Sequence, residues 1–136
     1  ADIIYEPKES VSLEGNSGPY LQYAHARACS ILRKGGAAGE GRGAPGTLGD
    51  LDGLERPLAH KISEYPEVLE KSARELLPHH ICTYLYELAQ IFNRFYEHAK
   101  VVGDPREAAR LKLVALYAGV LRDGLTLLGI AAPEQL

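Results

Sequence analysis

The sequence predicts an all-α fold, a bundle of about five helices behind a short extended N-terminal arm. Apolar residues recur at alternating spacings of three and four along two long segments, which is the period of an amphipathic helix. Prolines and glycines separate the predicted helices, and these helices have no sheet on which to pack. A chain of 136 residues buries roughly two-thirds of its unfolded surface, so the bundle needs no metal or disulfide for stability.

The first sixteen residues, 1–16, form the predicted extended arm. Ile3, Ile4 and Tyr5 are apolar, and residues 11–15 alternate between apolar and polar side chains as a short strand does. The chain contains no methionine, not even at position 1, although translation begins with methionine. We therefore expect a piece excised from a longer protein, with the arm left from the junction with a neighbouring domain.

Residues 17–136 form the predicted helical domain, and its first helix is marked at both ends. Asn16 and Ser17 are polar N-cap candidates, and Pro19 follows in the first turn. The helix should run from about Pro19 to Lys34, where two consecutive glycines end it.

A flexible loop is expected at 35–50. Seven glycines lie between positions 35 and 49, and ordering so much glycine backbone is costly in entropy. Residues 41–46 match the spacing of a dinucleotide-binding fingerprint, but a helix precedes them and Pro45 interrupts them. We interpret the stretch as a linker.

Three helices are expected after the loop, before the last one. Pro57 begins a short helix to about Glu64, and Pro66 begins another that runs to Leu77. A longer helix with an apolar stripe begins at Pro78. The stripe consists of Ile81, Leu85, Leu88, Phe92 and Phe95.

The last helix has clear signals at both ends. Asp104, Pro105 and Glu107 fit a capping box, with aspartate as N-cap, proline first and glutamate third in the helix. Gly129 suits a left-handed C-cap, and Ile130 can supply the apolar contact that accompanies it. The apolar stripe consists of Leu111, Val114, Ala118, Leu121, Leu125 and Leu128.

The charge distribution excludes some classes of protein. The net charge of −3 gives no global attraction for nucleic acid, although residues 17–48 carry a local charge of +3. The uncharged run from Leu113 to Leu121 is far shorter than the roughly 20 residues of a membrane span. Asp2, Glu6 and Glu9 stand where a signal peptide would be basic. We therefore expect no membrane partner and a cytoplasmic location.

No catalytic, metal-binding or cofactor-binding residues are predicted. Cys29 and Cys82 are 53 positions apart, which suits neither a metal site nor a disulfide framework, and we expect two buried thiols. The histidines show no metal-binding pair at i and i+4, and the sequence suggests no neighbouring cysteine–histidine pair. These histidines are His25, His60, His79, His80 and His98.

The first helix carries a second stripe that could bind RNA. Its apolar stripe, which should face the bundle, consists of Leu21, Ala24, Ala28 and Ile31. Rotated from it by about 100° lie Tyr20, Tyr23, Arg27, Ser30 and Lys34. Tyrosine rings and an arginine plane stack on unpaired bases, and basic side chains hold phosphates. The alternative is that both tyrosines pack sideways into the core with their hydroxyls in solvent.

A family resemblance lies in residues 15–27, which read GNSGPYLQYAHAR, and in the following Ser30-Ile31-Leu32. These residues resemble the junction helix of the arginyl-tRNA synthetases, which are class I enzymes. The resemblance continues at 84–89 and 92–96 and returns near the chain end, so it covers nearly everything except the glycine-rich loop. It implies a helical C-terminal anticodon-binding domain of the DALR type, although the string Asp-Ala-Leu-Arg does not occur here.

The resemblance also implies a function and the residues that perform it. The domain would bind the anticodon loop of an arginine tRNA. Tyr20 and Tyr23 would stack on bases, and Arg27 would contact a base edge or a phosphate. Lys34 would add nonspecific attraction, and Leu136 would approach the same loop from the chain end.

The resemblance assigns the chemistry to another part of the parent enzyme. The short histidine/glycine and lysine/serine signatures of class I catalytic domains are absent here. The chain is therefore expected not to be an enzyme on its own. ATP and arginine would bind to the catalytic domain of the parent arginine–tRNA ligase, and the arm at 1–16 would come from the junction with that domain.

Two alternatives remain. A helical protein-interaction module would favour an exposed apolar patch around Tyr84, Tyr86 and Phe92. The related helical domain of another class I synthetase, such as the cysteine enzyme, would bind a different tRNA.

Overall fold

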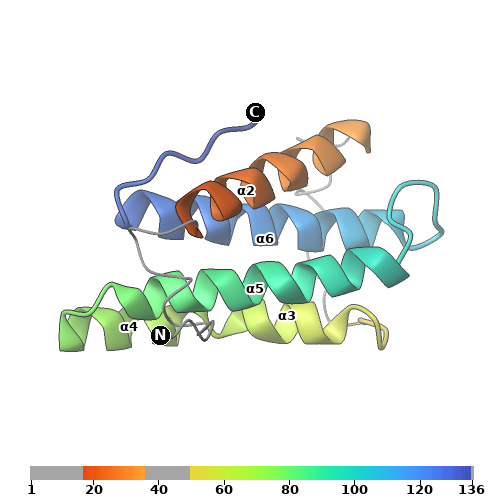
Figure 1. The fold of residues 1–136 in the computed structure, drawn as a ribbon. Helices are drawn as coiled ribbons and strands as arrows, with labels where there is room; N and C mark the ends of the chain where they lie inside the picture. The colour runs from red at the N-terminus through yellow and green to blue at the C-terminus, as the bar shows by residue number, and fades with distance from the viewer. Residues whose placement is uncertain (1–16, 36–49, 136) are drawn as a thin grey trace, which may run out of the picture.

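The computed structural model describes residues 17–35 and 50–135, and this part of the chain is helical. Figure 1 shows the helices in order along the chain. They are α2 (Ser17–Lys34), α3 (Arg56–Ser63), α4 (Tyr65–Glu75), α5 (His79–His98) and α6 (Glu107–Leu127). The all-α prediction is confirmed. The predicted arm at 1–16, the predicted loop at 35–50 apart from its two end residues, and Leu136 lie outside the described residues.

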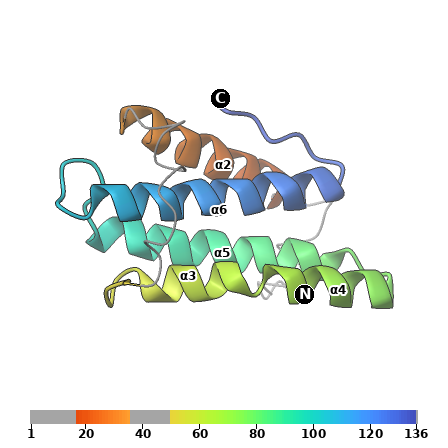
Figure 2. The same cartoon turned by 180° about the vertical axis from the view of Figure 1, so that it is seen from behind.

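The helices pack around α5, which contacts each of the other four. α3 and α4 follow one another along one side of α5, whereas α6 lies on its other side (Figures 1 and 2). α2 packs mainly on α6 and also contacts α5. The side chains shielded from solvent between them include Leu21, Leu58, Leu85, Leu88, Phe92, Leu113, Tyr117, Leu121 and Leu125. Within residues 17–35 and 50–135, no helix has the length and hydrophobicity that crossing a membrane requires.

α2 is the helix that carries the predicted RNA-binding stripe. It begins at Ser17, slightly before the predicted start at Pro19, and ends at Lys34 as predicted. Its predicted inner face is confirmed, since Leu21, Ala28 and Ile31 are buried and Ala24 is half-buried. A Cβ on Gly35 would lie 2.7 Å from Leu111 Cδ1 of α6, so glycine lets the end of α2 approach α6 closely.

The prolines mark the helix starts of the middle segment as predicted. Pro57 and Pro66 lie in the first turns of α3 and α4, where their missing N–H groups are not needed. α4 ends at Glu75, two residues earlier than predicted, because Leu76 adopts a left-handed conformation with φ of 56°. All five residues of the predicted α5 stripe are buried.

The two ends of α6 differ in how well the sequence predicts them. The helix begins at Glu107 rather than Pro105. The Asp104 carboxylate accepts a hydrogen bond from the Arg106 N–H at 2.8 Å, and the Glu107 carboxylate accepts one from the Gly103 N–H at 2.9 Å. These side chains therefore close a turn before the helix. At the other end the predicted cap is confirmed, with φ of 78° at Gly129 and a 2.8 Å hydrogen bond from the Ile130 N–H to the Leu125 carbonyl.

A buried ion cluster joins the segment before α3 to the start of α6. The Glu55 side chain is inaccessible to solvent and accepts hydrogen bonds from Arg106 Nε at 2.6 Å and Arg110 Nε at 2.7 Å. Asp52 accepts another from Arg110 Nη2 at 2.8 Å. Burial by itself raises the pKa of Glu55, but the hydrogen bonds from the two arginines outweigh it and lower that pKa to about 2.

Replacing Glu55 with glutamine should destabilise the domain by about 3 kcal/mol at neutral pH, because removing one partner of a buried ion pair leaves the other uncompensated. The folded-state pKa lies below the ordinary value of 4.5, so the contribution is complete above pH 4.5 and disappears as the pH falls towards about 2. Urea unfolding followed by circular dichroism at several pH values measures both effects.

The control is Glu87→Gln, because Glu87 is an exposed carboxylate paired with Lys61. It should cost less than about 1 kcal/mol. Equal losses in the two variants, or a Glu55→Gln effect that persists unchanged in acid, would contradict this account of the cluster.

Candidate nucleic-acid interface

One flank of α2 presents aromatic and basic side chains beside α5. Tyr23 is 58% exposed, and Lys34 is also exposed. Tyr20 and Arg27 are half-buried between the two helices. We call Tyr20, Tyr23 and Arg27 the α2 ledge. The alternative, that both tyrosines pack sideways into the core, therefore holds in part for the half-buried Tyr20. It does not hold for Tyr23, whose ring is open to solvent.

Tyr20 is held by two side chains of α5. Its ring lies 5.3 Å from the Tyr86 ring, tilted by 48°. Asn93 Nδ2 donates a long hydrogen bond of 3.4 Å to the Tyr20 hydroxyl. That bond uses the oxygen as an acceptor, so the Tyr20 O–H can still donate to a ligand.

Arg27 is oriented without being neutralised. Its Nη1 donates to Asn93 Oδ1 at 3.1 Å, and its guanidinium carbon lies 5.0 Å from the centre of the Tyr96 ring. Within residues 17–35 and 50–135 it forms no ion pair with a carboxylate. The charge is therefore held in place by a neutral amide and a ring, and it is available to a base edge or a phosphate.

Three α5 residues that support the ledge, Tyr86, Asn93 and Tyr96, were not among the predicted site residues. They recur at spacings of seven and three on α5, which places them on one flank of that helix, next to its apolar stripe. This periodicity could have identified the flank. It could not have shown that the flank faces α2.

The C-terminal tail extends the site along α2. The tail runs beside that helix (Figure 1), and its backbone carbonyls accept hydrogen bonds from Gln22 Nε2 at 3.0 Å and Arg33 Nη1 at 3.2 Å. Gln135 joins Tyr23, Ala26, Arg27, Ser30 and Arg33 around a shallow hollow of about 290 Å³. The tail therefore leads to the α2 ledge, and the predicted contact through Leu136 stays a prediction.

A cysteine–histidine pair does occur, contrary to the expectation from sequence. His25 and Cys29 lie one turn apart on α2, with Cys29 Sγ 3.8 Å from His25 Nε2. His25 is inaccessible to solvent, and its Nδ1 donates to the Pro133 carbonyl of the tail at 2.7 Å. Burial, reinforced by the nearby Glu134, raises the pKa of the Cys29 thiol, which disfavours a nucleophilic thiolate.

Cys29 and Cys82 are both buried thiols, as expected. Among the described residues no group of three or more histidine, cysteine, aspartate or glutamate side chains could hold a metal ion.

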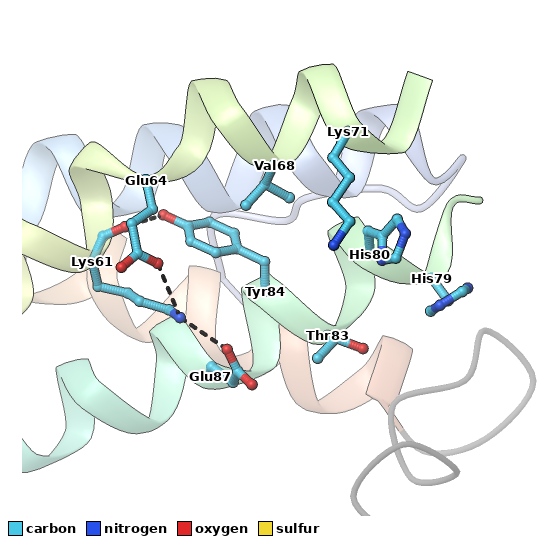
Figure 3. A pocket seen from close by; sticks show the side chains of 9 residues that line it. All are labelled: Lys61, Glu64, Val68, Lys71, His79, His80, Thr83, Tyr84 and Glu87. Carbon is cyan, nitrogen blue, oxygen red and sulfur yellow. Dashed lines mark hydrogen bonds and ion pairs between the residues drawn. The ribbon is translucent and has the colours of Figure 1, made fainter. Parts of the chain in front are cut away.

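A separate hollow of about 330 Å³ lies on the α3–α4 side of α5. Figure 3 shows the Lys61 ammonium between the carboxylates of Glu64 and Glu87, at 3.3 and 2.8 Å. His80 Nε2 lies 2.8 Å from a carboxylate oxygen of Glu75. Because the Lys61 ammonium already contacts two carboxylates, it is less available to an anion than the Arg27 guanidinium of the α2 ledge.

The apolar patch expected for a protein-interaction module does not form where the sequence suggested. Tyr84 and Phe92 are buried, with exposures of 3% and 1%, and Tyr86 packs on Tyr20. Tyr84 and Phe92 belong to the core, where Tyr84 stacks on Tyr65 of α4 and Phe92 on Tyr117 of α6. Exposed apolar side chains near that helix include Leu76 and Leu77, at the turn between α4 and α5.

The chain resembles known proteins throughout its length. Residues 21–136 match the model of the family described as the DALR anticodon binding domain. The chain is 41% identical over 139 residues to the arginine–tRNA ligase of Cellvibrio japonicus, covering 99% of the chain and 24% of that protein. It is 46% identical over 137 residues to the arginine–tRNA ligase of Frankia casuarinae, covering 99% and 23%.

The fold agrees with solved structures. The Thermus thermophilus arginyl-tRNA synthetase matches with a TM-score of 0.76 and 43% identity, over 92% of this chain and 22% of that one. A putative arginyl-tRNA synthetase from Campylobacter jejuni matches with a TM-score of 0.79 and 30% identity, over 89% and 27%. The chain thus spans about a quarter of the length of the relatives it matches.

The Arg27–Asn93 hydrogen bond should be measurable as a coupling between α2 and α5. In a double-mutant cycle of Arg27→Met and Asn93→Ala, the free energies of urea unfolding should be non-additive by about 1 kcal/mol. The matched cycle of Arg27→Met with Gln90→Ala, an exposed position on α5, should be additive. Additivity in both cycles would show that Asn93 does not hold Arg27.

Proposed function

Because the chain belongs to the DALR anticodon-binding domain family, we propose that it binds the anticodon loop of an arginine tRNA as part of a longer arginine–tRNA ligase. The observation that carries the proposal is the exposed Tyr23 ring beside Arg27, whose charge has no carboxylate partner in the described part of the chain. Because the relatives are named arginine–tRNA ligase, we favour an arginine tRNA over the tRNA of another class I synthetase.

The α2 ledge suits unpaired RNA. A base that leaves the loop stack can lie on the Tyr23 ring, and such a stack is worth about 1–3 kcal/mol. Tyr20, supported by Tyr86, offers a second ring, and Arg27 can contact a base edge or the backbone. A paired A-form stem would not expose its bases to this flank.

The remaining contacts are electrostatic and apolar. Lys34 lies at the end of α2 beyond Arg27, where it attracts the phosphate backbone without reading sequence. Leu136 would add apolar contact from the end of the tail, which the hydrogen bonds to Gln22 and Arg33 direct along α2.

We assign the ligation chemistry to the rest of the parent enzyme. The relatives are about four times as long as the part this chain covers, and their remaining length has room for a catalytic domain that binds ATP and arginine. In this assignment the chain supplies no catalytic residue and no cofactor site of its own. It would act in the cytoplasm beside that catalytic domain.

Replacing Tyr23 with alanine should weaken binding of the arginine anticodon stem-loop by about 1–3 kcal/mol, because one base loses its stacking surface. Fluorescence anisotropy with labelled stem-loop RNA gives the dissociation constants. Tyr23→Phe keeps the ring and should bind like the wild type.

Leu127→Ala is the matched control, because Leu127 is 56% exposed and lies on α6 away from the ledge. It should leave affinity unchanged. The assignment fails if Tyr23→Ala binds as tightly as the wild type, or if a cysteine stem-loop competes as well as the arginine one.

Binding should depend only weakly on salt, because Arg27, Arg33 and Lys34 are the cations that α2 offers to the loop. Each phosphate contact to single-stranded RNA contributes about 0.7 to the slope of log affinity against log salt concentration, so we expect a slope of about −2. Lys34→Gln should make it shallower by about 0.7. A slope steeper than about −5 would indicate a broad basic surface and contradict this interface.

A further inference from the structure

A small hollow lies directly beneath the α2 ledge. It has a volume of about 40 Å³ and is bordered by α2, α5 and α6. The lining residues are Tyr20, Tyr23, Ala24, Arg27, Phe92, Asn93 and Tyr117. This volume exceeds the roughly 10–15 Å³ that a cavity needs to hold one water molecule and is too small for a base ring, so the hollow admits one polar atom of a ligand.

The Tyr117 hydroxyl is unpaired in this setting. Tyr117 is inaccessible to solvent, and its Oη is the one buried side-chain polar atom without a hydrogen-bond partner among the described residues. The other buried tyrosine hydroxyls have partners, since Tyr65 donates to Asp123 and Tyr84 donates to the Lys61 carbonyl. Native proteins seldom leave a buried hydroxyl unpaired, so this one calls for a partner outside the described chain.

The position of the Tyr117 ring directs its hydroxyl to the ledge. The ring stacks on Phe92 with centroids 4.1 Å apart and planes 5° apart, which restricts its orientation. Burial raises the pKa of Tyr117, Tyr20 raises it further and Arg27 lowers it. Tyr117 lines the hollow together with Tyr20 and Arg27, and the same two side chains perturb its hydroxyl, so the hydroxyl lies on the ledge side of the core.

The groups around the hollow favour a hydrogen-bond acceptor. Tyr20 and Tyr117 each have an O–H that can donate, and Arg27 has further N–H groups and a positive charge. The Asn93 carbonyl oxygen already accepts from Arg27. An oxygen atom with lone pairs and no proton fits this set better than an amino group.

We propose that a carbonyl oxygen of one unpaired anticodon-loop base enters this hollow and accepts a hydrogen bond from the Tyr117 hydroxyl. The proposal rests on the proposed function, because the same base would lie against the α2 ledge. Tyr117 then acts as a specificity residue. A base without an oxygen at that position leaves the hydroxyl unpaired in the complex, which a buried polar site penalises strongly.

The test compares Tyr117→Phe with the wild type in binding the arginine anticodon stem-loop. The variant keeps the stack on Phe92 and loses only the hydroxyl. It should bind about three- to tenfold more weakly, the usual range for one neutral hydrogen bond. The urea midpoint of the free protein should stay the same or rise, because an unpaired buried hydroxyl has been removed.

The matched control is Tyr84→Phe, which removes a buried hydroxyl that is paired with the Lys61 carbonyl on the α3–α4 side. It should lower the urea midpoint and leave RNA affinity unchanged. Unchanged affinity in Tyr117→Phe overturns the inference. If Tyr23→Ala weakens binding in the same assay, the proposed function still stands, whereas no effect of either substitution rejects both.

A sulfur scan of the loop identifies the oxygen. Each base carbonyl is replaced in turn by thiocarbonyl, which is larger and a weaker acceptor. At the base that Tyr117 contacts, the replacement should weaken binding to the wild type and have little further effect in Tyr117→Phe. Equal effects in both proteins at every position would contradict the contact.

Discussion

The α2 ledge depends on one amide. Asn93 of α5 accepts from Arg27 and donates to Tyr20, so a single side chain sets the position of both residues relative to the helix beneath them. The burial of Leu21, Ala28 and Ile31 sets the rotation of α2, and the same rotation turns Tyr23 outwards. A stack of Phe92 on Tyr117 supports the ledge from below. Arg27 and Tyr20 are therefore oriented before any RNA arrives, which lowers the entropy lost on binding.

The molecule uses its basic residues in two different ways. Arg106 and Arg110 of the α6 region are neutralised by Glu55 and hold the chain together. Arg27 is held by an uncharged amide and an aromatic ring, so its charge is kept for a ligand. The net charge of −3 does not reveal this difference, because it sums the charges of the structural ion pairs and those of the small positive surface. An RNA-binding domain with such a surface gains specificity from a few well-oriented contacts more than from its overall electrostatic field.

Much of the fold could be predicted from local sequence. Prolines marked the starts of α3 and α4, and helical periodicity identified the buried faces of α5 and α6. The local rules placed two helix ends slightly wrongly. The left-handed Leu76 shortened α4, and the capping residues before α6 closed a separate turn. The partners of the ledge were missed for a different reason, since Asn93 is 66 positions from Arg27 and no local pattern pairs them.

The most direct test of the account is a nuclear magnetic resonance titration of the chain, labelled with nitrogen-15, with the arginine anticodon stem-loop. Amide shifts should change along the outer flank of α2 around Tyr23 and Arg27, and on α5 around Asn93. The α3–α4 side, around Lys61, should stay unchanged. Shifts that cluster on the α3–α4 side and spare α2 would contradict the claim that the α2 ledge binds the RNA.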